Sequence, residues 1–427
     1  MLDASPSAAP YSSPSATPMR SYDVVVLGAS GFTGRLAVQY LNERYSSLNY
    51  AVTARSTTKL EQLKQMISGS PNAVATLCDV TDPLSLDSVV RSASCVLNFA
   101  GSPFIDKALP VVEACAKHGT HYVDITGEVP LHRASYDRYH KAAAESGAII
   151  LHQCGFDSVP ADLCAYLAVK AMRERHDCQC SEVRLIMADS KGGVSGGTLA
   201  SGAHLIANRD LPGMAEVKAR GAYPLDPADG TGGPDTSFDG RNGALVSYDV
   251  LARTWTMPFI MSGVNVPLVR KSAALLGYGA QDGCRISEAA ACKSRLEGIR
   301  NLFAIGIGGF FFVLPPTRWL LLKLGIIPSP GEGPNEHTRE TGHFHEYAIA
   351  VGAKEGAPVV KAHMRSGDAG DPGYKATARM ACEAALTLAL QRSDCHKQGG
   401  VLTPAVALGD AYIKRLQVSG MELNVDS

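Results

Sequence analysis

A glycine-rich turn near the N-terminus carries the most specific chemical signal in the sequence. Its glycines recur every three residues, at Gly28, Gly31 and Gly34. Between a strand and a helix, the first glycine makes a tight turn, the second lets the backbone approach a pyrophosphate, and the third lets helix and strand pack closely. Phosphates would then lie against unpaired N–H groups at the start of the helix. The pattern predicts a dinucleotide site formed by Gly28, Ser30, Gly31, Phe32, Thr33 and Gly34. A glycine-rich turn without a ligand is the alternative.

The end of the second predicted strand indicates which dinucleotide binds. NAD-binding domains usually place an acidic residue there, which accepts a hydrogen bond from the ribose 2′-hydroxyl. This chain has Ala54, Arg55 and Ser56 instead, with no acid. The planar guanidinium of Arg55 can pair with a 2′-phosphate through several N–H donors. We therefore predict that NADP(H) is preferred over NAD(H), with a solvated surface arginine as the alternative interpretation of Arg55.

Two further turns follow strands at the same edge of the predicted sheet. Asp79 and Val80 follow the third strand, where an adenine ring often lies. Ala100 and Gly101 follow the fourth strand, where small residues let a cofactor approach. Ligands of open α/β sheets bind beyond the carboxyl ends of the strands. We include these four residues in the predicted cofactor site, and ordinary turn residues are the alternative.

Acidic and hydroxyl side chains follow the fifth and sixth predicted strands. Asp124 and Glu128 come after the fifth, and Asp157 and Ser158 come after the sixth. All four are candidate catalytic residues, because the carboxyl groups could transfer protons if they lie within hydrogen-bond reach of a substrate. The alternative is that they cap helices and fix loops, which suits Asp157 and Ser158 because a helical pattern follows them.

The elements that would position these residues alternate regularly. Short apolar segments predict six strands, at Tyr22–Leu27, Tyr50–Ala54, Val74–Leu77, Cys95–Phe99, Tyr122–Ile125 and Ala148–His152. Helical patterns lie between them, which favours a parallel sheet covered on both faces. We therefore expect an α/β fold, with a doubly wound Rossmann domain over residues 22–155. Beyond it, the sequence predicts a long surface loop at Gly221–Gly243 and helices at Ala378–Leu390 and Leu402–Arg415.

An uncharged apolar segment, Leu302–Leu314, is broken by Pro315 and Pro316 and resumes at Trp319–Ile327. Thirteen residues are too few to span a bilayer, which requires about 20. One interpretation is a buried helix or a subunit interface, as in a homodimer. The other is a hairpin in a membrane or lipid-droplet surface, with Arg318, Trp319 and Lys323 at the level of the headgroups.

Composition excludes several classes of protein. The 427 residues are 45% hydrophobic and 19% charged, with a formal net charge of −1 and no basic run, so we expect no nucleic-acid partner. Eleven irregularly spaced cysteines without a C-x-x-C pair indicate no metal site and reduced thiols in an intracellular protein. Residues 1–21, rich in Ser, Ala and Pro, are expected to be a disordered tail.

Several motifs together resemble a known family. They are Gly28–Arg35, Tyr122–Glu128, Cys154–Pro160, Lys191–Thr198, Pro330–Pro334, Gly370–Tyr374 and Gly399–Pro404. The chain resembles the saccharopine dehydrogenase-like oxidoreductases over nearly its whole length from Tyr22, most of all the branch that includes the mycobacterial trans-acting enoyl reductases.

The resemblance implies a Rossmann domain completed by C-terminal helices at 378–427, with an α+β substrate or interface domain inserted at 156–377. It also implies an NAD(P)-dependent oxidoreductase that reduces a lipid-like enoyl or carbonyl substrate. Two alternatives stay open. One is a saccharopine reductase or dehydrogenase, although no matching arginine cluster is found in the sequence. The other is a catalytically silent, dinucleotide-binding scaffold on a membrane or lipid droplet.

Overall fold

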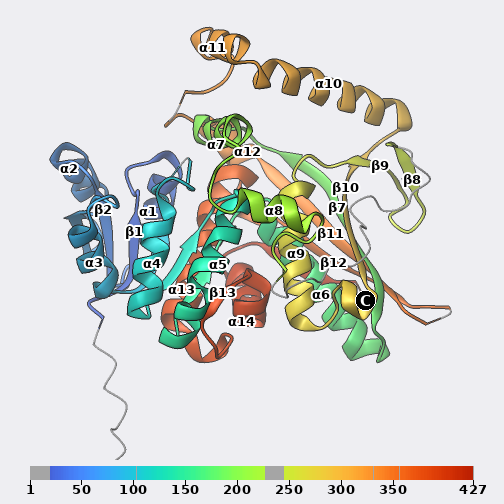
Figure 1. Cartoon of the computed structure of the whole chain (residues 1–427), viewed down its shortest axis with the longest axis horizontal. Coiled ribbons are helices and arrows are strands. Elements are labelled where there is room, and N and C mark those ends of the chain that lie inside the picture. Colours follow the sequence, from blue (N-terminus) through green and yellow to red (C-terminus); the bar gives the residue numbers. More distant parts are fainter. Residues whose placement is uncertain (1–19, 102, 227–244, 330, 355, 427) are drawn as a thin grey trace, which may run out of the picture.

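Two sheets lie side by side in the computed structural model, which describes residues 20–426 apart from 102, 227–244, 330 and 355 (Figure 1). The predicted tail therefore lies outside the described residues except for Arg20 and Ser21, and so does most of the predicted loop at 221–243. All eleven cysteines are buried and unpaired.

The first sheet is parallel throughout, with strand order β13-β6-β5-β4-β1-β2-β3. Its strands are β1 (Tyr22–Leu27), β2 (Tyr50–Ala54), β3 (Ala73–Leu77), β4 (Ala93–Asn98), β5 (His121–Asp124), β6 (Ile149–Leu151) and β13 (Gly400–Leu402). The six strands predicted from apolar runs are confirmed. The seventh was missed, because the helix expected from Leu402 begins at Pro404 and residues 400–402 pair with β6 as a strand.

Helices cover both faces of this sheet. Along β1, Val24 and Val26 face one core while Val25 and Leu27 face the other, as alternate side chains of a strand must. The helices of this part are α1 (Phe32–Arg44), α2 (Thr57–Met66), α3 (Pro83–Ser92), α4 (Ala108–His118), α5 (Val129–Ser146), α13 (Thr377–Leu390) and α14 (Pro404–Val418). α1 and α13 cover one face, while α3 and α4 cover the other.

The C-terminal segment returns to the first sheet through buried contacts. α13 packs against α1, β1, β4 and β5. Within α13, the fully buried carboxylate of Glu383 accepts hydrogen bonds from Tyr40, Tyr45 and Arg415, which joins α1 to α14. The last strand, β14 (Glu422–Val425), continues into the second sheet instead.

The second sheet is mixed, with order β14-β12-β11-β7-β10-β9-β8. Its other strands are β7 (Cys180–Lys191), β8 (Ser247–Asp249), β9 (Thr254–Pro258), β10 (Arg285–Cys292), β11 (His343–Gly352) and β12 (Val359–Arg365). The remaining helices are α6 (Ser158–His176), α7 (Gly196–Ala207), α8 (Met214–Arg220), α9 (Ser262–Leu276), α10 (Arg295–Val313), α11 (Pro315–Lys323) and α12 (Glu336–Thr341). Short 3-10 turns lie at Ala280–Asp282, Gly367–Ala369 and Arg392–Asp394, and a π-helical turn at Pro372–Ala376.

One core joins the two sheets. α6 follows β6 of the first sheet and packs on β11 and β12 of the second, and its buried residues belong to the same cluster as those of β1. The carboxyl end of β6 therefore lies where the two halves meet, which places Asp157 beside residues of the second sheet.

The apolar segment at Leu302–Ile327 forms α10 and α11, which lie across the top of the molecule in Figure 1. Most of their large apolar side chains are exposed, including Phe303 and Trp319. The interpretation of this segment as a buried core helix is therefore wrong, because both helices lie outside the packed layers.

Candidate active site

The glycine-rich turn joins β1 to α1 in the geometry that a pyrophosphate requires. Gly28 has a φ of +70°, and a Cβ there would lie 2.5 Å from the backbone N of Ala100 at the end of β4. A Cβ on Gly34 would lie 2.3 Å from the carbonyl oxygen of Gly28. Neither position can carry a side chain without displacing backbone, so the spacing keeps strand and helix in close contact.

The start of α1 leaves backbone donors free for an anion. Gly31 is the N-cap and supplies no side-chain hydrogen bond, so the first N–H groups of the helix have no partner within it. These donors, together with the positive end of the helix dipole, suit a phosphate. Ser30 and Thr33 are half-buried beside the turn, and Phe32 packs edge-on against Tyr374 with ring centroids 5.2 Å apart.

Arg55 lies exposed after β2, where the ribose of a bound dinucleotide would lie. Its positive charge and that of Lys107 act on Asp79, whose carboxylate accepts hydrogen bonds from the backbone N and hydroxyl of Thr81 at 2.9 and 2.8 Å. Those hydrogen bonds first, and the two cations next, lower the pKa of Asp79. The charges of Arg55 and Lys107 both act on the half-buried Asp79, and two cations in this region can pair with the added charge of a 2′-phosphate.

The remaining predicted cofactor residues have local structural roles. Val80 is buried in the core under α3. Ala100 donates its backbone N–H to the Asn98 side chain at 2.8 Å. A Cβ on Gly101 would lie 2.5 Å from the Phe104 ring, so packing against that ring already explains the glycine.

Glu128 fixes the loop after β4. Its two carboxylate oxygens accept hydrogen bonds from the backbone N–H groups of Phe104 and Ile105, at 2.9 and 2.8 Å, and it is 2% exposed. Both oxygens are therefore occupied by backbone donors, which suits a positioning role.

Asp124 organises the ends of β5 and β6. Its fully buried carboxylate accepts from the Tyr122 hydroxyl at 2.8 Å and from the backbone N–H of Thr126 at 3.1 Å. Nδ1 of His152 lies 2.7 Å from the same carboxylate, and Nε2 of His152 lies 2.8 Å from the Ser135 hydroxyl. The network holds adjacent strand ends in one fixed arrangement.

Asp157 belongs to a group of three carboxyls that the structure brings together from different elements. Asp157 precedes α6, Glu288 lies on β10, and Glu346 lies on β11. The charge of Glu288 acts on Asp157, and those of Glu288 and Asp157 act on Glu346. Glu346 is fully buried, whereas Asp157 and Glu288 are half-buried as whole residues. We call these three residues the carboxyl cluster.

Neutral side chains border the carboxyl cluster. The Ser158 hydroxyl donates to Asn265 at 3.0 Å, and the Asn265 amide donates to Glu288 at 2.9 Å. Both oxygens of Glu346 and Oε2 of Glu288 are buried without a hydrogen-bond partner among the described residues. Buried carboxyls in this situation are stable when they hold a proton.

Burial is the main cause of the raised pKa values in the carboxyl cluster. It raises the pKa of Asp157 to about 8, with a further contribution from Glu288. It raises the pKa of Glu288 to about 7, against the lowering effect of the Asn265 hydrogen bond. It also raises the pKa of Glu346 well above its usual range, helped by the charges of Glu288 and Asp157. The cluster therefore retains protons near neutral pH.

A short chain of contacts links the glycine-rich turn to the carboxyl cluster. Phe32 packs on Tyr374, and three residues further on the Thr377 hydroxyl accepts a hydrogen bond from the backbone N of Phe156 at 2.9 Å. Asp157 is the next residue. The predicted phosphate site and the carboxyl cluster thus lie along the same edge of the first sheet.

A buried lysine connects α9 to this edge. Lys271 Nζ lies 2.8 Å from Nε2 of His132 and donates to the carbonyl of Val401 at 3.0 Å. Nδ1 of His132 lies 2.7 Å from the side-chain oxygen of Gln153. Burial first, and the charge of Arg133 next, lower the pKa of Lys271 well below its usual value. A lysine held neutral can sit in this position without a counter-ion.

Sequence reasoning missed Glu288, Glu346, Asn265 and Lys271. The signal was present for two of them, because each glutamate interrupts an apolar strand, in Arg285–Cys292 and His343–Gly352. A single acid in an otherwise buried strand is rarely tolerated without a function or a partner.

A family model that includes the glycine-rich turn matches most of the first sheet of this chain. The model of the saccharopine dehydrogenase NADP binding domain matches residues 24–151. A Mycobacterium tuberculosis protein provisionally named a trans-acting enoyl reductase is 36% identical over 417 residues, covering 96% of this chain and 98% of the relative. The trans-acting enoyl reductase of Mycobacterium bovis is 33% identical, covering 94% of this chain and 97% of its own. The solved saccharopine dehydrogenase (L-Glu forming) of Saccharomyces cerevisiae has a TM-score of 0.49 at 13% identity, covering 94% and 99% of the two chains.

The NADP-binding domain provides a test of Arg55. We expect Arg55→Ala to weaken NADPH binding roughly 10- to 100-fold, because a charge-assisted hydrogen bond contributes about 1.5–3 kcal/mol, and to leave NADH binding nearly unchanged. Fluorescence titration with both nucleotides measures the two affinities. Arg91→Ala on α3 is the matched control. Equal losses for NADPH and NADH would contradict the assignment of Arg55 to the 2′-phosphate.

The carboxyl cluster predicts a pH-dependent stability. A raised pKa means that the folded protein binds more protons than the unfolded chain, so the free energy of unfolding falls as pH rises from about 4.5 to about 8. Each such proton contributes a slope of about 1.4 kcal/mol per pH unit.

Urea unfolding across this pH range measures the slope. Glu346→Gln should flatten it, because one titrating group and its repulsion on the others are removed. Glu422→Gln on the exposed edge strand should not. If both variants keep the wild-type slope, the carboxyl cluster does not hold protons in the folded state.

Proposed function

Since the chain belongs to the family of the trans-acting enoyl reductases, within the saccharopine dehydrogenase-like oxidoreductases, we propose that it uses NADPH to reduce a lipid-like enoyl substrate. Reduction of the carbonyl group of a lipid-like substrate is the closely related alternative. The chain is an NAD(P)-dependent oxidoreductase with an NADP-binding domain. The silent-scaffold alternative has no support among the relatives.

The single observation that carries the proposal is the proximity of the glycine-rich turn to the carboxyl cluster. Reduction of a carbon–carbon double bond adds a hydride to one carbon and a proton to the other, and NADPH, when bound, supplies the hydride. The protein must then provide the proton and exclude water. In this proposal the phosphates lie at Gly28–Gly34, and the substrate lies between the nicotinamide end and Asp157.

Asp157 is the proposed proton donor. It is the member of the carboxyl cluster on the loop after β6, at the edge of the first sheet that also carries the glycine-rich turn. Its pKa of about 8 keeps it protonated at neutral pH. Glu288 then acts as a positioning residue, because its negative charge raises the pKa of Asp157. Glu346 lies behind both of them as a buried acid that holds its own proton.

The proposed substrate class follows from what surrounds the edge. A segment after α11 packs on the glycine-rich turn, since a Cβ on Gly333 would lie 2.5 Å from the Phe32 ring. That segment connects directly to the exposed apolar helices α10 and α11. An apolar substrate such as a long-chain enoyl thioester suits this approach better than a small amino acid with several carboxylates.

Steady-state kinetics test the proposal. We expect the protein to oxidise NADPH with α,β-unsaturated acyl thioesters, and not with lysine and 2-oxoglutarate or with glutamate and 2-aminoadipate 6-semialdehyde. The turnover number should be constant below pH 8 and fall above it, as Asp157 loses its proton.

Asp157→Asn should lower the turnover number by roughly 10²- to 10⁴-fold and remove the fall at high pH, with NADPH binding unchanged. The exposed Asp210→Asn is the matched control. Retention of the high-pH fall in Asp157→Asn would reject Asp157 as the donor. Failure of every enoyl and carbonyl substrate with a protein that binds NADPH would reject the proposed reaction.

A further inference from the structure

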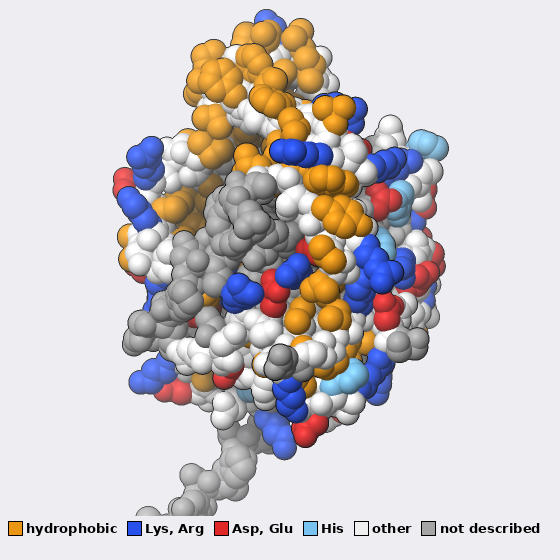
Figure 2. All heavy atoms as spheres, turned by 90° about the vertical axis from the view of Figure 1, so that its right-hand side faces the viewer, with side chains coloured by type: hydrophobic (Ala, Val, Ile, Leu, Met, Phe, Trp, Pro, Cys, Tyr) orange, Lys and Arg blue, Asp and Glu red, His pale blue; other side chains and the backbone are white. Residues whose placement is uncertain are grey.

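The two helices α10 and α11 and the residues after them, 295–327, form a projecting arm whose exposed surface is largely apolar. α10 is long and apolar enough to cross a membrane, and 6% of its most apolar window is buried. Phe303, Phe310, Trp319 and Ile326 are each exposed by 60% or more. Figure 2 shows hydrophobic side chains gathered over the projecting top of the molecule. Apolar surface of this extent marks a site of interaction with a protein or a membrane.

The arm is tethered to the same body at both ends. α10 follows β10 directly and contacts α7 and β9. After α11, the carbonyl of Glu332 accepts a hydrogen bond from the backbone N of Gly196 at 3.2 Å, and Gly333 lies against Phe32. α10, about 28 Å long, therefore lies across the body (Figure 1). This orientation suits a helix that lies within a surface and does not suit one that crosses a bilayer.

Charge is distributed as an interfacial helix requires. Residues 301–317 contain no charged side chain, while the flanking parts of α10 and α11 carry four basic residues and one acidic residue. On α11, Lys323 Nζ lies 4.9 Å from the centroid of the Trp319 ring. Tryptophan beside a basic residue is typical of the headgroup level of a membrane, and the excess of basic residues favours anionic lipid.

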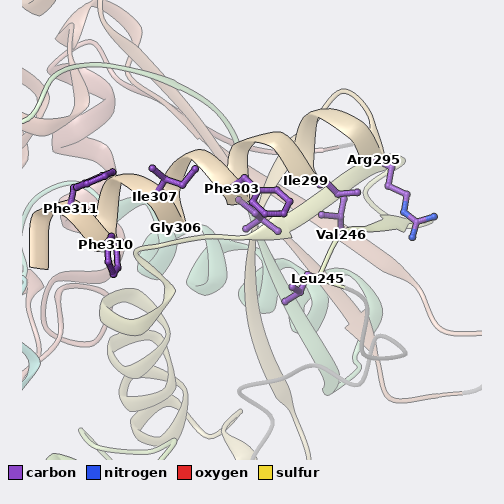
Figure 3. Close-up of a pocket in the computed structure, with 10 residues that line it drawn as sticks. Leu245, Val246, Arg295, Ile299, Phe303, Gly306, Ile307, Phe310 and Phe311 are labelled. Atoms are coloured by element: carbon purple, nitrogen blue, oxygen red, sulfur yellow. The ribbon is translucent and has the colours of Figure 1, made fainter.

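A groove of about 690 Å³ runs beneath α10. Phe303, Ile307 and Phe310 line it together with Val246, and Arg295 lies at one end (Figure 3). Among the described residues that line the groove, Arg295 is the only charged one. Contact of this apolar lining with water is unfavourable. Acyl chains that bend around the helix would remove the lining from water.

We propose that the arm docks flat on a lipid membrane surface that contains anionic phospholipid. The exposed aromatic and aliphatic side chains insert among the acyl chains, and Arg300, Arg318 and Lys323 lie among the headgroups. The proposal does not depend on the reaction assigned above. Docking would hold the edge of the first sheet close to the lipid, because the segment that follows the arm packs on Phe32 at Gly333.

Tryptophan fluorescence of the full chain tests this docking directly. The chain has two tryptophans, and Trp255→Phe leaves Trp319 as the only one. With vesicles of phosphatidylcholine and phosphatidylserine, we expect the emission of Trp319 to shift to the blue. Lipids with a quencher near the headgroup should quench it more than lipids with a quencher deep in the chains. Binding should weaken in phosphatidylcholine alone and at high salt.

Phe303→Asp combined with Ile307→Asp should weaken vesicle binding roughly tenfold or more, because both side chains lose their burial in lipid. Leu84→Asp on α3, which replaces an exposed apolar side chain outside the arm, is the control. NADPH binding by each variant shows that it is folded.

Three outcomes would overturn the proposal. Absence of vesicle binding by the folded chain is the first. Stronger quenching by the deep quencher would indicate a helix that crosses the bilayer. A blue shift that depends on protein concentration without lipid, together with a dimer in light scattering, would show that a second copy covers the arm.

Discussion

Carboxyl groups cannot stay charged where water is excluded and no cation lies among them, and the region between the two sheets is built around this constraint. Glu346 is fully buried, and neither of its oxygens has a hydrogen-bond partner among the described residues. Burial therefore raises its pKa, and burial also raises the pKa values of the neighbouring Glu288 and Asp157. As a result, protonated carboxyl groups lie beside the carboxyl end of β6. The fold provides it because α6 joins the two sheets through one core.

The loops around this region are fixed by buried polar groups whose hydrogen-bonding capacity is used. Glu128 binds two backbone N–H groups of the loop after β4, and Asp124 joins the ends of β5 and β6 through Tyr122 and His152. Lys271 joins α9 to His132 and to β13. Such contacts remove conformational freedom from the loops before a ligand arrives, which lowers the entropic cost of binding. Asp124 and Glu128 are therefore buried acids that hold loops in place and do not contact substrate.

Local patterns in the sequence predicted the first sheet, the glycine-rich turn and the preference for NADP(H), because each depends on residues close together in the chain. The carboxyl cluster could not be predicted in this way. Its members come from the loop before α6 and from two strands nearly 60 residues apart, and only the tertiary fold brings them together. The strand β13 was missed because three residues are too few to show a period. The apolar character of the arm was evident from the sequence. Whether the arm is buried in the core or exposed on the surface depends on the tertiary fold, and the sequence did not decide it.

The central claim is that hydride from NADPH and a proton from the protein are added across an unsaturated bond. The most direct measurement follows the hydrogen atoms. A long-chain enoyl thioester would be reduced with NADPH that carries deuterium at both C4 positions of the nicotinamide, and the product would be examined by mass spectrometry. The account predicts one deuterium in the product on the carbon distal to the thioester, with a solvent hydrogen on the adjacent carbon. A product without deuterium, or substrate that remains unreduced while NADPH is bound, would contradict it.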